Sequence, residues 1–195
     1  MLNLLVGFYL ATIISSIFTT RLFNLYLWYA INSLMLGSIA LLNGVKLNDK
    51  ALLIVGGLTI LIKFLIIPYI LRYLTLKFKI DRKINPLISI QYLIILVPVI
   101  LVFTFYLVIP ILQNLTFNAN YVAISIASLF LAVILIITHS NIGAKIVGFL
   151  YLENSLFLLE VSATNGMPMV VELGIFVDLM MLILIINLLF KYQGE

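Results

Sequence analysis

Long apolar runs separated by short polar segments make up most of the chain. A membrane-spanning helix needs about 20 mostly apolar residues, and runs of that length recur along the sequence. Runs such as LLIVGG and YLIILVPVILVFTFYLVI do not alternate between apolar and polar positions, which argues against the strands of a β-barrel. The pattern therefore predicts an all-α integral membrane protein with seven spans, at residues 2–20, 23–43, 51–76, 87–112, 120–138, 142–164 and 168–190.

The connections between the expected spans are short and rich in turn residues. They include NGVKLND, KFKIDRKINP, QNLTFNAN, HSNIG and TNGMP, none of which leaves room for a soluble domain. The first span lacks the basic start of a signal peptide, so we expect it to be retained. We divide the chain into a four-helix N-terminal membrane region, residues 1–118, and a three-helix region, residues 119–195.

Composition supports a membrane protein and limits its chemistry. Of the 195 residues, 65% are hydrophobic and 9% are charged, more apolar side chain than a soluble domain of this size can bury. The chain has no cysteine and one histidine, which excludes thiolate metal sites, iron–sulfur clusters and a bis-histidine haem in this chain. We expect no cofactor here, and any redox chemistry would take place on another subunit.

The basic residues predict how the chain sits in the membrane. Positive charge marks the cytoplasmic side, so the N-terminus is expected outside and the C-terminus in the cytoplasm. The basic loop 77–86 is interpreted first as this topology signal, with a phospholipid or nucleic-acid patch as the alternative; we expect no nucleic-acid partner. With seven spans, Lys46 and Lys50 fall on one side, and the other side holds Arg21, Arg72, Lys77, Lys79, Arg82, Lys83, Lys145 and Lys191.

Acidic residues occur where a membrane makes charge costly. Glu153 lies about eleven residues, or ~16 Å, from the cytoplasmic start of the sixth span. A charge at that depth costs roughly 2.5–3.5 kcal/mol, so the carboxyl must be protonated, paired or facing water inside the bundle. Lys63 is the base at mid-membrane in the third span, at a matching depth. We therefore expect Lys63 and Glu153 to be partners.

Three further acids extend this pattern. Glu160 lies two turns beyond Glu153 on the same face. The short TNGMP connection makes the last two spans antiparallel neighbours, which puts Glu160 level with Glu172 and Glu153 level with Asp178. We expect Glu153, Glu172, Lys63, Glu160 and Asp178 to transfer protons. The alternative is that these residues form static pairs that hold helices together.

The histidine and the asparagines at the expected span ends and inside the spans can each be interpreted in two ways. His139, at the cytoplasmic end of the fifth span, is either a place where protons enter, because its pKa lies near neutrality, or a solvated residue favoured by the helix dipole. Asn154, together with Asn141, Asn165 and Asn187, either lines a hydrated path or caps and bridges helices.

The stretch IVGFLYLENSLFLLEVSATNGMPMVVELGIFVDLMMLILI resembles the C-terminal region of the component E family of hydrogenase-4. These proteins are membrane subunits of group 4 nickel–iron hydrogenase and formate hydrogenlyase-like complexes. GFLYLEN at 148–154 and MPMVVELG with FVDL at 167–179 carry the resemblance, which covers about residues 139–190. In the first four spans it rests on helix number, helix order and LIKFLIIPYILRYL. The family's last three spans are similar to the K subunit of respiratory complex I and to the C-type subunit of sodium/proton antiporters.

The resemblance implies roles for particular residues. Glu153 and Glu172 match the membrane glutamates of the family, and Lys63 matches a lysine of its third span. The first glutamate of the complex I K subunit corresponds to Leu150 here, so Glu153 is displaced by about one turn.

The resemblance also implies a function. It indicates a non-catalytic membrane-arm subunit, in the plasma membrane of a prokaryote, that contributes to proton translocation or to its coupling to electron transfer. Antiporter-like membrane subunits and a peripheral redox module with nickel–iron and iron–sulfur centres would be its partners. The alternatives are a K-like subunit of a complex I or a multisubunit cation/proton antiporter, and an assembly scaffold with static membrane ion pairs.

Overall fold

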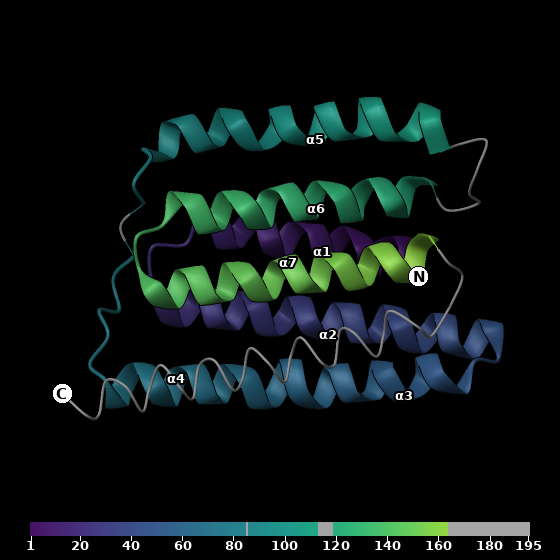
Figure 1. Ribbon diagram of the computed structural model, residues 1–195, viewed down its shortest axis with the longest axis horizontal. Coiled ribbons are helices and arrows are strands. Elements are labelled where there is room, and N and C mark those ends of the chain that lie inside the picture. The colour runs from purple at the N-terminus through teal and green to yellow at the C-terminus, as the bar shows by residue number, and fades with distance from the viewer. Residues whose placement is uncertain (85, 113–118, 164–195) are drawn as a thin grey trace.

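The computed structural model describes residues 1–84, 86–112 and 119–163, which are almost entirely helical (Figure 1). Helices α3, η1 and α4 follow one another without a break and form one rod, Lys50–Lys77. The helices are α1 (Leu2–Ile17), α2 (Leu22–Leu47), α3 (Lys50–Thr59), the π-helix η1 (Ile60–Ile66), α4 (Ile67–Lys77), α5 (Ile90–Leu112), α6 (Ala119–Thr138) and α7 (Ile142–Ala163).

Within these residues, five helical rods are long and apolar enough to cross a membrane, namely α2, α3–η1–α4, α5, α6 and α7. The chain is thus a multi-pass, all-α membrane protein. The shorter α1 has 16 residues and ends at Ile17, before the expected boundary at residue 20; the chain leaves the helical conformation at Phe18 and is extended at Arg21, where α2 begins. The expected span 168–190 lies outside the described residues.

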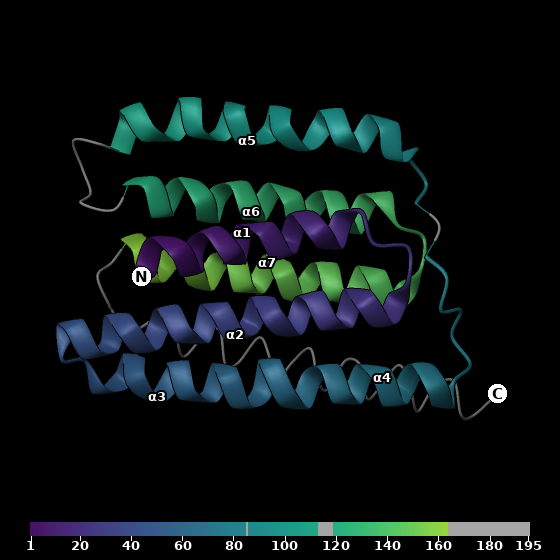
Figure 2. The same cartoon turned by 180° about the vertical axis from the view of Figure 1, so that it is seen from behind.

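The helices lie side by side with their long axes nearly aligned, and short connections alternate between the two ends of the bundle (Figures 1 and 2). Helix α6 packs on α5 and α7, while α1 and α2 pack on each other and α2 also contacts α3, η1 and α4. The largest fully buried side chains include Tyr9, Tyr29 and Tyr151, from α1, α2 and α7. Tyrosine hydroxyls inside an apolar bundle need polar neighbours, so the core between these three helices is polar as well as packed.

Glycines let two pairs of helices approach closely. A Cβ at Gly37 of α2 would lie 2.4 Å from Ile60 Cγ1, and one at Gly148 of α7 would lie 2.5 Å from Ile136 Cγ1. Small residues at such contacts are typical of membrane helices, where close van der Waals packing drives association. These contacts fix α2 against the α3–η1–α4 rod and α7 against α6.

A π-helical segment interrupts the long rod next to a proline. The backbone N–H of Ile67 bonds to Ile62 O, five residues back, and Pro68 follows. Proline has no N–H and its ring clashes with the carbonyl four residues earlier, so a widened turn before it relieves the clash. Lys63 lies inside this segment and is its buried residue.

A polar loop crosses one end of the bundle. This crossing loop (residues 78–84 and 86–89) runs from α4 to α5, along the left side of Figure 1. It bonds to the α1–α2 connection through Leu22 N to Arg82 O (2.9 Å) and Ile84 N to Thr20 O (2.9 Å). It reaches the α6–α7 connection through Leu87 N to Thr138 O (2.7 Å). Three connections therefore meet at one end, where most of the basic residues of the described ranges collect.

Candidate functional site

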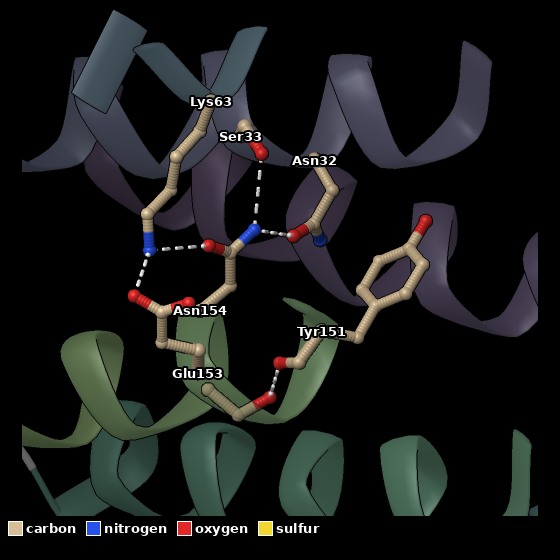
Figure 3. Close-up of polar contacts among 7 residues, drawn as sticks. Asn32, Ser33, Lys63, Tyr151, Glu153 and Asn154 are labelled. Carbon is tan, nitrogen blue, oxygen red and sulfur yellow. Dashed lines mark hydrogen bonds and ion pairs between the residues drawn. The ribbon is translucent and has the colours of Figure 1, made fainter. Parts of the chain in front are cut away.

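The pair expected from matching depths is present at the centre of the bundle. Lys63 Nζ lies 2.8 Å from Glu153 Oε1, and the two side chains are 6% and 8% exposed (Figure 3). Lys63 comes from the π-helix η1 and Glu153 from α7. A pair so deeply buried is sensitive to the loss of either partner, because the remaining charge would stay in a low-dielectric region.

Asn154 connects this ion pair to α2. Its Oδ1 accepts a hydrogen bond from Lys63 Nζ at 3.2 Å. Its Nδ2 donates to Asn32 Oδ1 at 3.0 Å and to Ser33 Oγ at 3.1 Å (Figure 3). The amide thus uses its acceptor on the lysine and both of its hydrogens on α2.

Asn32 continues the chain of amides to α1. Its Nδ2 donates to Tyr9 O at 3.1 Å and to Thr12 Oγ1 at 2.8 Å. At the far end Lys63 can only donate, and here the carbonyl of Tyr9 can only accept. Neither amide can reverse its orientation without losing a bond at one of these ends, so Asn154 and Asn32 form a fixed brace for Lys63 and not a proton wire.

A second set of polar contacts joins α1 to α7 through hydroxyl groups. Tyr9 Oη lies 3.3 Å from Ser155 Oγ, and Ser155 Oγ donates to Tyr151 O at 2.8 Å. Tyr151 Oη shares a short hydrogen bond with Ser16 Oγ, and Ser16 Oγ also lies 2.9 Å from Thr12 O. Because a hydroxyl has one hydrogen to donate and each serine gives its hydrogen to a backbone carbonyl, Tyr9 and Tyr151 donate to the serines, and this set, like the amides, has a fixed direction of donation.

The other predicted acids are only partly within the described residues. Glu160 is buried on α7, with 8% of its surface exposed. Glu172 and Asp178 lie outside the described ranges, and so do the expected pairings of Glu160 with Glu172 and of Glu153 with Asp178.

His139 is fully buried at the end of α6. Its interpretation as a solvated residue is wrong, because the residue has no exposed surface; the crossing loop lies beside it and pairs with it through the Pro86–His139 β-bridge. His139 Nδ1 donates to Leu135 O at 3.1 Å and lies 3.0 Å from Thr138 Oγ1. Burial lowers the pKa of His139, and the bond to the Leu135 carbonyl opposes that shift. The hydrogen bonds of the described residues do not connect His139 to the Lys63–Glu153 pair.

For two of the four asparagines the cap-and-bridge interpretation is confirmed. Asn154 bridges Lys63 to α2, as described. Asn141 Oδ1 accepts from Gly143 N at 2.8 Å in the first turn of α7, and its Nδ2 donates to Asp81 O of the crossing loop at 2.9 Å. Asn165 and Asn187 lie outside the described residues.

Sequence reasoning missed the supports of the ion pair on α1 and α2. A signal for them exists, since Tyr9, Thr12 and Ser16 follow one another at spacings of three and four and so share a helix face. Asn32 and Ser33 are likewise adjacent polar residues in the middle of an apolar span.

A relative of this chain is the uncharacterized protein Rv0085 of Mycobacterium tuberculosis (strain ATCC 25618 / H37Rv). The two are 27% identical over 158 residues, which cover 79% of this chain and 71% of that protein. No protein-family model and no solved structure matches the chain. The comparison thus finds a relative across most of both chains and attaches no activity to it.

Proposed function

We propose that this chain is a non-catalytic membrane-arm subunit of a hydrogenase-type, complex I-related oxidoreductase, and that it contributes to proton translocation or to its coupling to electron transfer. The observation that carries the proposal is the Lys63–Glu153 ion pair, buried at the centre of a membrane-spanning bundle. The resemblance of the C-terminal stretch to hydrogenase-4 component E is the reason for proposing a redox module as the partner.

Physical chemistry favours a functional role for this pair. Replacing a buried ion pair by apolar residues of similar volume is often neutral or stabilising, so burial of charge is weak evidence for a stabilising role. Ionisable side chains inside membrane helices are by default candidates for proton relays. A lysine paired with a glutamate has two states to exchange, because either side chain can hold the proton that they share.

The brace formed by Asn154 and Asn32 keeps Lys63 in position while this exchange takes place. When Glu153 takes up a proton, the Coulomb attraction to Lys63 is lost. Asn154 Oδ1 then still accepts a hydrogen bond from Lys63 Nζ, which holds the lysine in position until Glu153 releases its proton. In this mechanism Glu153 carries the proton, Lys63 controls when it leaves, and Glu160, Glu172 and Asp178 extend the path.

We include the membrane topology of the chain in this proposal. It comprises seven spans, with the N-terminus outside and the C-terminus in the cytoplasm, in the plasma membrane of a prokaryote. Antiporter-like membrane subunits would adjoin the chain, and a peripheral module would hold the nickel–iron and iron–sulfur centres.

Purification of the native complex tests the assignment. The tagged chain is extracted in mild detergent, its partners are identified, and bound nickel is quantified. We expect nickel, a hydrogenase-like large subunit and antiporter-like proteins. Iron–sulfur proteins without nickel would move the chain to a complex I or antiporter assembly, and a chain that purifies alone would contradict the proposal.

A charge-removing variant tests the proton-transfer role in that complex. Glu153→Gln should leave the complex assembled and lower redox-driven proton transport. Asp49→Asn is the matched control, since it removes a carboxylate from an N-cap, where asparagine caps equally well. Unchanged transport in Glu153→Gln would refute the role of Glu153.

An assembly scaffold is the second candidate, and the fixed amide brace favours it. Asn154 and Asn32 use every amide hydrogen on α1 and α2, as expected of a contact built to hold helices together. For a scaffold, Glu153→Gln lowers the yield of the complex and leaves the transport per assembled complex unchanged.

A further inference from the structure

A charged cleft opens where α2 begins, away from the buried ion pair. Its volume is about 600 Å³. The cleft lies between the first turn of α2 and the crossing loop, at the end of the bundle where three connections meet. Its lining residues are Thr20, Arg21, Phe23, Asn24, Arg82 and Lys83.

The backbone forces like charges together at this cleft. An antiparallel β-bridge pairs Arg21 with Lys83, and like charges held directly opposite each other are destabilising. The guanidinium groups of Arg72 and Arg82 each lie 5.2 Å from the centre of the same Phe23 ring. Four cations therefore converge on one side of the bundle.

Among the described residues, these cations form no ion pair with a carboxylate. The ion pair of the described residues is Lys63–Glu153, and no carboxylate among them pairs with Arg21, Arg82 or Lys83. Asp81 is the acidic neighbour in the loop, and its Oδ1 accepts from the backbone N–H of Lys83 at 3.0 Å. A bound anion would provide the missing compensation.

The start of α2 adds to this field. Arg21 is the N-cap and provides no capping side chain, and Phe23 and Asn24 of the first turn line the cleft. The N-terminus of a helix carries partial positive charge and free N–H groups. Anions that bring several oxygens, such as a phosphate group, suit both the guanidinium groups and this helix end.

We propose that the cleft binds the phosphate group of an anionic membrane phospholipid. The cleft lies at the ends of membrane-crossing helices, the level at which lipid headgroups lie. Leu27, one turn from Phe23 towards the middle of α2, is 59% exposed, so an acyl chain can lie on the helix below the headgroup. A free phosphate would make no use of that apolar surface, and the proposal does not depend on proton transport.

The chain contains its own reporter for this site. Trp28, its one tryptophan, lies four residues after Asn24 on α2, one helical turn away. Bromine atoms on a lipid acyl chain quench tryptophan fluorescence at close range. The full chain, purified in mild detergent, is titrated with dibrominated phosphatidylglycerol and, separately, with dibrominated phosphatidylcholine.

We expect the anionic lipid to quench Trp28 at a lower mole fraction than the zwitterionic lipid. Each basic residue near a membrane contributes about fivefold in affinity for anionic lipid, so Arg21→Gln with Arg82→Gln should weaken the preference about 25-fold. Lys46→Gln with Lys50→Gln, at the opposite end of the bundle, should leave it unchanged. Added salt should weaken the preference in the unmodified protein, a result that requires no variant to fold.

Three outcomes would overturn the proposal. Equal quenching by both lipids would mean that the cleft does not distinguish an anionic from a zwitterionic headgroup. Displacement of the effect by inorganic phosphate alone would assign the cleft to a soluble anion. If the double arginine variant keeps its lipid preference and instead loses an acidic subunit from the complex, the cleft docks a protein.

Discussion

The buried ion pair permits a quantitative prediction of how its two residues depend on each other. Lys63 and Glu153 are each less than a tenth exposed, which removes them from the class of surface pairs worth ~0–1 kcal/mol. Loss of one partner from a buried pair costs about 3–5 kcal/mol. The structure distinguishes the two partners, because Lys63 donates both to Glu153 and to Asn154.

Lys63→Met removes the donor from both acceptors, and we expect a loss at the upper end, about 4–5 kcal/mol. Glu153→Gln keeps a neutral acceptor in the same place and loses the charge, so we expect about 1.5–3 kcal/mol. Once Lys63 is absent, removing the charge of Glu153 has little further cost. The double variant should therefore resemble Lys63→Met, below the sum of the single effects by about 2 kcal/mol.

Unfolding of the purified protein by sodium dodecyl sulfate, followed through Trp28 fluorescence, measures these differences. Lys145→Met is the control, because Lys145 is an exposed basic residue of α7 and its loss should change stability by less than about 0.5 kcal/mol. The reasoning fails if the two single effects add to within about 0.5 kcal/mol, or if Lys63→Met costs no more than an exposed pair would.

Three further predictions concern other parts of the bundle. Gly148→Val should lower the free energy of unfolding by about 1–3 kcal/mol, because its Cβ would lie 2.5 Å from Ile136 Cγ1. Gly57→Ala should be tolerated, because nothing lies within 4 Å of a Cβ at that position. Thermal unfolding of the two variants measures the difference. Asn154→Leu should lower both the stability towards detergent and the proton transport of the complex, and transport at the unmodified rate would contradict its positioning role. Because burial lowers the pKa of His139 below its ordinary 6.5, its neutral form stabilises the fold above that pH, and this stability is lost as the pH falls through the lower pKa of the folded state. His139→Gln should flatten the decline in unfolding midpoint on going from pH 7.5 to 5.5, as seen by circular dichroism, and an unchanged slope would contradict it.

The sequence predicted the membrane class and the central pair because both follow from length and depth. Counting residues from a span boundary gives the depth of a side chain in the membrane. The matching depths of Lys63 and Glu153 were enough to predict that they pair. The predicted boundaries of the longer helices agree with the structure within a few residues, for example 142–164 against Ile142–Ala163.

The rotation of each helix about its axis was not predictable in the same way. A soluble helix shows its buried face by its apolar stripe, but α1 and α2 are apolar around most of their circumference, so periodicity does not show which of their residues face inward. Asn32 and Thr12 were for this reason not seen as neighbours of Asn154. His139 pairs with Pro86, in a loop some fifty residues earlier in the chain, and the sequence around His139 does not predict that contact.

The π-helical segment has a consequence for how the long rod meets α2. From the end of α3 onwards, the buried positions of the rod are each four residues after the last, at Thr59, Lys63, Ile67, Leu71 and Thr75. At 3.6 residues per turn, a step of four overshoots a full rotation by about 40°, so four steps would carry Thr75 about 160° away from Thr59. Yet Thr75 Oγ1 lies 2.9 Å from Tyr26 Oη on α2. The widened turn absorbs part of this drift, so that one continuous rod presents Lys63 to Glu153 of α7 and, three turns later, Thr75 to Tyr26 of α2.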